Sequence, residues 1–94
     1  MLSDIPKKLE KVSKENIDKE ILRAGIIAEL DAVNLYEQMA AMAEDGNIKK
    51  MLLDIAKEEK THVGEFQALL LNRDEEQVKE LEAGKEEVKK EVGE

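Results

Sequence analysis

Residues 28–38, AELDAVNLYEQ, and residues 58–63, EEKTHV, hold the three side chains that constrain this chain most: Glu29, Glu59 and His62. Each stretch has the apolar spacing of an amphipathic helix and sets ionisable groups within the apolar stripe. Glu59 and His62 are three residues apart, so they project from the same side of a helical turn. The two stretches therefore predict a pair of facing helices with a carboxylate and a Glu-x-x-His pair between them.

The surrounding sequence predicts an all-α, antiparallel two-helix hairpin. The first helix is expected from about residue 14 to residue 43, with Ser13 as its N-cap. Gly46 is expected to supply the C-cap and the turn, and Asn47 is expected to cap the second helix, whose apolar pattern ends near Leu70. A connection this short makes the two helices antiparallel neighbours.

The ends of the chain differ from this hairpin. Residues 1–13 are polar and contain Pro6, which predicts a flexible N-terminal arm. Asp74 is expected to cap a short, highly charged C-terminal helix over about residues 74–91. Residues 14–94 are therefore interpreted as one small helical domain.

The apolar arc of the first helix is wider than a single packing partner requires. The residues within about 60 degrees of Glu29 are uncharged, and a second apolar flank widens the arc to roughly 200 degrees, where one partner needs about 100. The first helix is therefore expected to pack against at least two others. Gly25 and Gly64 are each about 1 kcal/mol less favourable than alanine within a helix, which indicates close helix approach near the ionisable residues.

A carboxylate moved into apolar surroundings without a partner costs several kcal/mol. A divalent cation would offset the charges of Glu29 and Glu59, and His62 would add a directional nitrogen ligand. The chain has no cysteine, so a metal would be held by oxygen and imidazole alone. These ligands suit iron or manganese, with calcium, zinc or manganese as substitutes in a crystal. The alternative is a hydrogen-bonded Glu/His cluster that only fixes the helix register.

Four further side chains have simpler interpretations. Tyr36 lies two turns from Glu29 on the same face, where a core tyrosine is expected to hydrogen-bond its hydroxyl to a polar group, with a ligand carboxylate as one candidate. Met39, Met42 and Met51 fit core packing better than a metal site.

One chain supplies half of a di-iron centre. A complete centre in a helix bundle uses a Glu from each of two helices and a Glu-x-x-His pair from each of two others, and this chain has one of each. Two-fold association of two hairpins would build a four-helix bundle with Glu29, Glu59 and His62 of each subunit around the axis. The sequence therefore predicts a homodimer in which the site is complete only after assembly.

Composition excludes several classes of function. The 94 residues carry a net charge of -8, and the lysines are interleaved with glutamates, which argues against nucleic-acid binding. The apolar stretches are too short to span a bilayer, and the start of the chain has no signal-peptide core. We expect a soluble, cytoplasmic protein with no nucleic-acid or membrane partner.

The runs 28–38 and 58–63, together with Leu69-Leu70-Leu71, resemble the encapsulated ferritins, cargo proteins of encapsulin nanocompartments. The resemblance covers roughly residues 20 to 90. It implies a hairpin with a short C-terminal helix, assembled as an annular decamer of five dimers, with the ferroxidase centre at a dimer interface.

The resemblance also implies the chemistry of the site. On this likeness Glu29, Glu59 and His62 are the iron ligands of an inter-subunit di-iron centre, and Tyr36 matches the tyrosine beside them. The implied reaction oxidises Fe2+ to Fe3+ with dioxygen or peroxide, and the surrounding shell receives the mineral. The encapsulin shell protein is then the expected partner, and the nanocompartment is the expected location.

The sequence departs from the family pattern at two places. Relatives carry carboxylates flanking the first ligand as an iron access route, whereas here Asp31 is present but position 28 is alanine. Relatives also continue into a shell-docking peptide or a fused shell protein, and the sequence ends at Glu94 without either, which leaves a trimmed domain, a piece of a fusion and another mode of loading as alternatives. Two other functions compete: a non-catalytic helical assembly protein, and a rubrerythrin-like peroxide reductase, which would lack its Cys-rich electron-transfer element.

Overall fold

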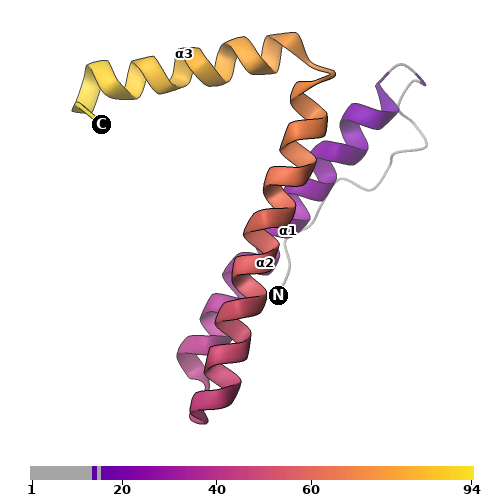
Figure 1. The fold of residues 1–94 in the computed structure, drawn as a ribbon. Helices are drawn as coiled ribbons and strands as arrows, with labels where there is room; N and C mark the ends of the chain where they lie inside the picture. Colours follow the sequence, from indigo (N-terminus) through magenta and orange to yellow (C-terminus); the bar gives the residue numbers. More distant parts are fainter. Residues whose placement is uncertain (1–13, 15) are drawn as a thin grey trace.

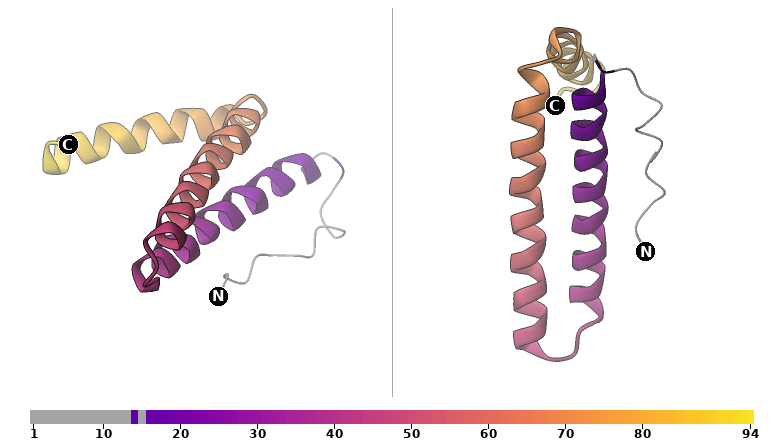
Figure 2. Two further views of the ribbon diagram at one scale, coloured as in Figure 1. Left: turned by 60° about the horizontal axis from the view of Figure 1, so that its bottom comes forward. Right: turned by 90° about the vertical axis from the view of Figure 1, so that its right-hand side faces the viewer.

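The structure is a computed structural model that describes Lys14 and residues 16–94, and its regular elements are three α-helices (Figure 1). Helix α1 spans Ile17–Met42, α2 spans Gly46–Leu71 and α3 spans Glu75–Val92. Helices α1 and α2 run side by side and are joined by a short turn, as the right-hand view of Figure 2 shows. The predicted all-α hairpin with a C-terminal helix is confirmed for these residues.

The N-terminal predictions concern residues on both sides of the boundary of the described chain. The arm over residues 1–13, including the expected cap Ser13, lies outside the described residues. Helix α1 begins at Ile17 rather than near residue 14, and Asn16 precedes it without a side-chain capping hydrogen bond. Its first turn carries Asp18 and Glu20, which favour this end of the helix through the helix dipole.

The turn between α1 and α2 differs from the prediction. Ala43, in an extended conformation, ends α1, and Gly46 is already the first residue of α2. Asp45, not Asn47, is the N-cap: its carboxylate accepts hydrogen bonds from the backbone N–H groups of Asn47 at 2.8 Å and Ile48 at 3.1 Å. Aspartate and asparagine are equally good caps, but the negative charge of Asp45 is additionally stabilised at a helix N-terminus.

The core of the described chain is small and lies between α1 and α2. Two of its members, Ala40 and Ala56, are each only 2% exposed, so alanine side chains let the two helices approach closely. The buried apolar residues are Leu22, Val33, Ala40, Ala56 and Leu70.

Thirteen large apolar side chains are exposed, far more than scattered surface residues would account for. They are Ile21, Ile27, Leu30, Met39, Met42, Ile48, Met51, Leu53, Leu69, Val78, Leu81, Val88 and Val92. The prediction that Met39, Met42 and Met51 are core residues is therefore wrong for a single chain. Nine of the thirteen lie on α1 and α2, on apolar flanks that the hairpin does not cover, as the wide arc predicted for the first helix requires, and the other four lie on α3.

Helix α3 turns away from the hairpin and does not fold back along it (Figures 1 and 2). Asp74 caps it as predicted, since its Oδ1 accepts the backbone N–H of Gln77 at 3.0 Å, and this hydrogen bond lowers the pKa of the Asp74 carboxyl. The other oxygen, Oδ2, lies 2.9 Å from Nη2 of Arg23 on α1. Gly93 ends α3 in the left-handed conformation with φ 77°, where glycine is favoured.

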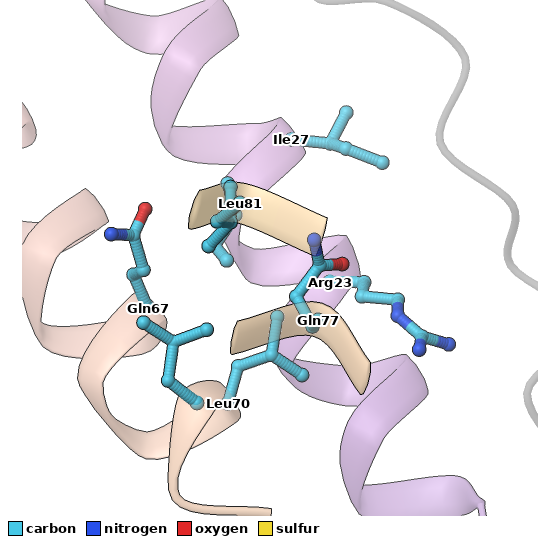
Figure 3. A pocket seen from close by; sticks show the side chains of 8 residues that line it. Arg23, Ile27, Gln67, Leu70, Gln77 and Leu81 are labelled. Atoms are coloured by element: carbon cyan, nitrogen blue, oxygen red, sulfur yellow. The ribbon is translucent and has the colours of Figure 1, made fainter. Parts of the chain in front are cut away.

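A groove of about 350 Å³ lies where the three helices meet. Figure 3 shows side chains of all three around it, with Ile27 from α1, Leu70 from α2 and Leu81 from α3. Arg23 is the one charged residue among those that line it, so the groove offers no set of metal ligands. None of the three described helices combines the length and the apolar character needed to cross a bilayer.

Candidate metal centre

The hairpin brings Glu29 of α1 together with Glu59 and His62 of α2. The Nδ1 atom of His62 lies 3.3 Å from Oε2 of Glu29 and 3.3 Å from Oε2 of Glu59. One potential ligand atom from each of the three residues lies within 4.8 Å of the other two. The structure therefore places the three residues singled out from the sequence in one cluster, hereafter the Glu/His cluster.

The Glu/His cluster is less buried than the sequence predicted. The side chains of Glu29 and Glu59 are 20% and 18% exposed, but that of His62 is 44% exposed. The prediction that all three are buried is wrong for the single chain, because the apolar stripe of α1 and α2 covers only one side of the cluster. The more open side is that of His62.

The donor set fits a divalent transition-metal ion. Around one ion with bonds of about 2.1 Å, ligands at right angles are about 3 Å apart and opposite ligands about 4.2 Å apart. The separations in the Glu/His cluster, 3.3 Å and at most 4.8 Å, need only small side-chain movements to reach these values. Two carboxylates and one imidazole are a mixed oxygen and nitrogen set that suits iron or manganese.

One helical turn from the cluster, the Phe66 ring lies over Gly25. The sequence marks Gly25 as a position of close helix approach but does not identify Phe66 as its partner. The sequence signal for this contact was Gly25 itself, because a glycine that is unfavourable in a helix indicates close helix approach. The same prediction for Gly64 is wrong within this chain, because nothing lies within 4 Å of a Cβ built there.

Two other predicted residues remain untested. Tyr36 is half-buried on α1, two turns beyond Glu29, and among the described residues it makes no hydrogen bond with the Glu/His cluster. Asp31 is also half-buried on α1. A role for Tyr36 beside the ligands, or for Asp31 in iron access, stays a prediction.

A helical hairpin with a carboxylate on one helix and Glu-x-x-His on the next is the half-site arrangement of ferritin-like di-metal proteins. The comparisons agree: the family model described as Rubrerythrin matches residues 20–93. The crystal structure of the encapsulated ferritin domain from Pyrococcus furiosus superposes with a TM-score of 0.86 and 57% identity, over 100% of this chain and 98% of that one.

The "Ferritin-like-encapsulin shell fusion protein" of Pyrococcus furiosus is 69% identical over 74 residues, which are 79% of this chain. The match spans only 21% of that relative's own length. The chain belongs to the rubrerythrin and ferritin-like family, as one of its encapsulated ferritin domains.

Proposed function

We propose that this chain is a ferroxidase whose active centre is completed by a second copy of itself. The observation that carries the proposal is the Glu/His cluster, in which two carboxylate oxygens lie 3.3 Å from one imidazole nitrogen. Glu29, Glu59 and His62 would bind the substrate ion Fe2+. Each Fe2+ would give up one electron to dioxygen or peroxide and leave as Fe3+.

The cluster in one chain is incomplete, which supports a contribution of ligands from a second copy. Three protein ligands satisfy only half of the Glu and Glu-x-x-His set of a di-iron centre, and His62 is open on one side. The uncovered apolar side chains of α1 and α2 supply a surface that a second hairpin would bury. A two-fold axis beside His62 would then bring six ligand side chains around two ions. Tyr36 would lie near these ligands, and assembly as five dimers is the family expectation.

The relatives support a biological setting for this activity. One relative's name joins a ferritin-like part to an encapsulin shell in a single protein. We propose that this chain likewise works with an encapsulin shell, which would retain the Fe3+ mineral that an open ring cannot enclose. The net charge of -8 favours the local accumulation of cations such as Fe2+.

Aerobic addition of Fe2+ tests the proposal. We expect Fe3+ absorbance to rise faster with protein than in buffer, native mass spectrometry to show dimers or larger rings, and protein from iron-supplemented cells to hold about one iron per chain. Glu29→Gln, Glu59→Gln and His62→Ala should each slow the oxidation.

The control is Glu58→Gln, which removes an exposed carboxylate next to Glu59 in sequence but outside the Glu/His cluster. Its oxidation rate should equal that of the parent protein. An assembled protein that oxidises iron at the buffer rate would refute the ferroxidase and favour the non-catalytic assembly protein. Reduction of peroxide by an added electron donor, without Fe2+ as the substrate, would favour the peroxide reductase.

A further inference from the structure

A close contact between α1 and α2 lies one helical turn from the Glu/His cluster. A Cβ built on Gly25 would lie 3.0 Å from Cε1 of Phe66 and 3.1 Å from both Cδ1 and Cζ. These separations are shorter than ordinary van der Waals contact between carbon atoms. No residue other than glycine therefore fits at position 25 unless the ring or a helix moves.

The positions of the two residues link this contact to the cluster. Gly25 precedes Glu29 by four residues on α1, and Phe66 follows His62 by four residues on α2, so each lies one turn from a cluster residue on the same helix face. Both Gly25 and Phe66 are partly buried. The spacing of the helices at Gly25 and Phe66 therefore determines how far apart Glu29 and His62 can lie.

We infer that the Phe66 ring, seated on Gly25, is a positioning contact that holds Glu29 within metal-ligand distance of Glu59 and His62. A phenyl ring is rigid and has few rotamers, so it fixes the helix separation more tightly than a flexible side chain would. A shift of a few tenths of an ångström matters here, because the 3.3 Å separations lie within the range of about 3 to 4.2 Å that ligands of one ion span, and a wider helix spacing would move Glu29 out of it. This inference rests on the proposed metal-binding function.

Gly64 provides a matched control for a test. Both glycines lie inside helices, and both would gain helix propensity as alanine. At Gly64, however, an added Cβ meets nothing within 4 Å in the chain. Gly25→Ala and Gly64→Ala therefore differ in the contact with Phe66 and not in their direct effect on the backbone.

The experiment measures Co2+ affinity and the visible Co2+ spectrum of the purified full chain, with helicity checked by circular dichroism. We expect Gly25→Ala to raise the Kd for Co2+ about tenfold, the size typical when supports of metal ligands are changed, and to shift the Co2+ absorption bands. Gly64→Ala should leave the Kd and the bands unchanged and raise the melting temperature. The double variant Gly25→Ala/Phe66→Leu, which makes room for the methyl group, should recover most of the lost affinity.

The outcomes separate this inference from the proposed function. If the parent protein binds neither Co2+ nor Fe2+, the proposed function fails and the positioning role with it. If the parent binds Co2+ and Gly25→Ala binds it equally well, or if both glycine variants weaken binding equally, only the positioning role is overturned. Should Gly25→Ala not fold, Phe66→Leu alone carries the test: a Kd raised about threefold supports the inference, and an unchanged Kd overturns it.

Discussion

The Glu/His cluster should destabilise the metal-free protein, and Glu29→Gln should therefore stabilise it. The candidate ligand oxygens of Glu29 and Glu59 lie within 4.8 Å of each other. At that separation two unit negative charges repel by about 3.5 kcal/mol at an effective dielectric constant of about 20 and by about 1 kcal/mol in water. Because both side chains are about one-fifth exposed, we expect a repulsion between these two limits, of about 1 to 2 kcal/mol.

Glutamine keeps the shape of Glu29 and one acceptor oxygen, which can still face Nδ1 of His62, while removing the charge, so the substitution mainly reports the repulsion. The assay is urea unfolding in the presence of a chelator, with the parent and the variants measured in the same buffer. Glu29→Gln should raise the free energy of unfolding by about 1 to 2 kcal/mol with an unchanged m-value.

In the presence of metal, the parent protein should be more stable than Glu29→Gln. With Co2+ at about 100 times its Kd, the parent protein should gain about 2.7 kcal/mol. Glu29→Gln should gain much less, because it has lost a ligand. Glu58→Gln, the exposed control, should follow the parent in both conditions. A Glu29→Gln variant that is less stable than the parent without metal, or that gains as much as the parent with metal, would refute the reasoning.

Three further predictions concern the helices themselves. Asp45→Ala should lower the free energy of unfolding by about 1 kcal/mol in urea titrations, whereas Asn47→Ala should change it little, because Asp45 is the residue that caps α2; equal losses would contradict this assignment. Ala56→Leu should destabilise the chain by about 1 to 3 kcal/mol, because Ala56 is 2% exposed between the helices; an unchanged melting temperature would show that the site has room. The pKa of Asp74 is lowered in the folded chain, so the ionised carboxylate contributes fully to the free energy of unfolding above the ordinary aspartate pKa. This contribution should be lost as pH falls through the lower, folded value. An acid titration of helicity should show a transition in the parent protein that Asp74→Asn lacks.

The sequence was sufficient for the hairpin and for the grouping of the cluster, because both follow from helical periodicity. Glu29 occupies the apolar stripe of one helix, and Glu59 and His62 occupy that of the other, so two stripes that pack must bring them together. An error of one or two residues in the position of a helix end does not change which residues lie on the facing stripes. The misplaced start of α1 therefore did not affect the prediction of the site.

The details that escaped prediction depend on local backbone geometry or on what lies outside one chain. Asp45 and Asn47 are both good caps, and only the extended backbone of Asp45 settles which of them reaches the free N–H groups. Gly25 and Gly64 look alike in sequence, but only Gly25 faces a ring. Periodicity marks Met42 as apolar without showing that the hairpin leaves it 80% exposed.

The unbroken course of α2 from Gly46 to the Glu/His cluster limits which insertions the protein can tolerate. One residue added between Ile48 and Glu59 would rotate Glu59 and His62 by about 100 degrees around the helix axis, away from Glu29. One residue added within 43–45, where the chain is not helical, leaves both helix faces directed as they are. Length variation among functional homologues is therefore expected in this connection and not in the first half of α2.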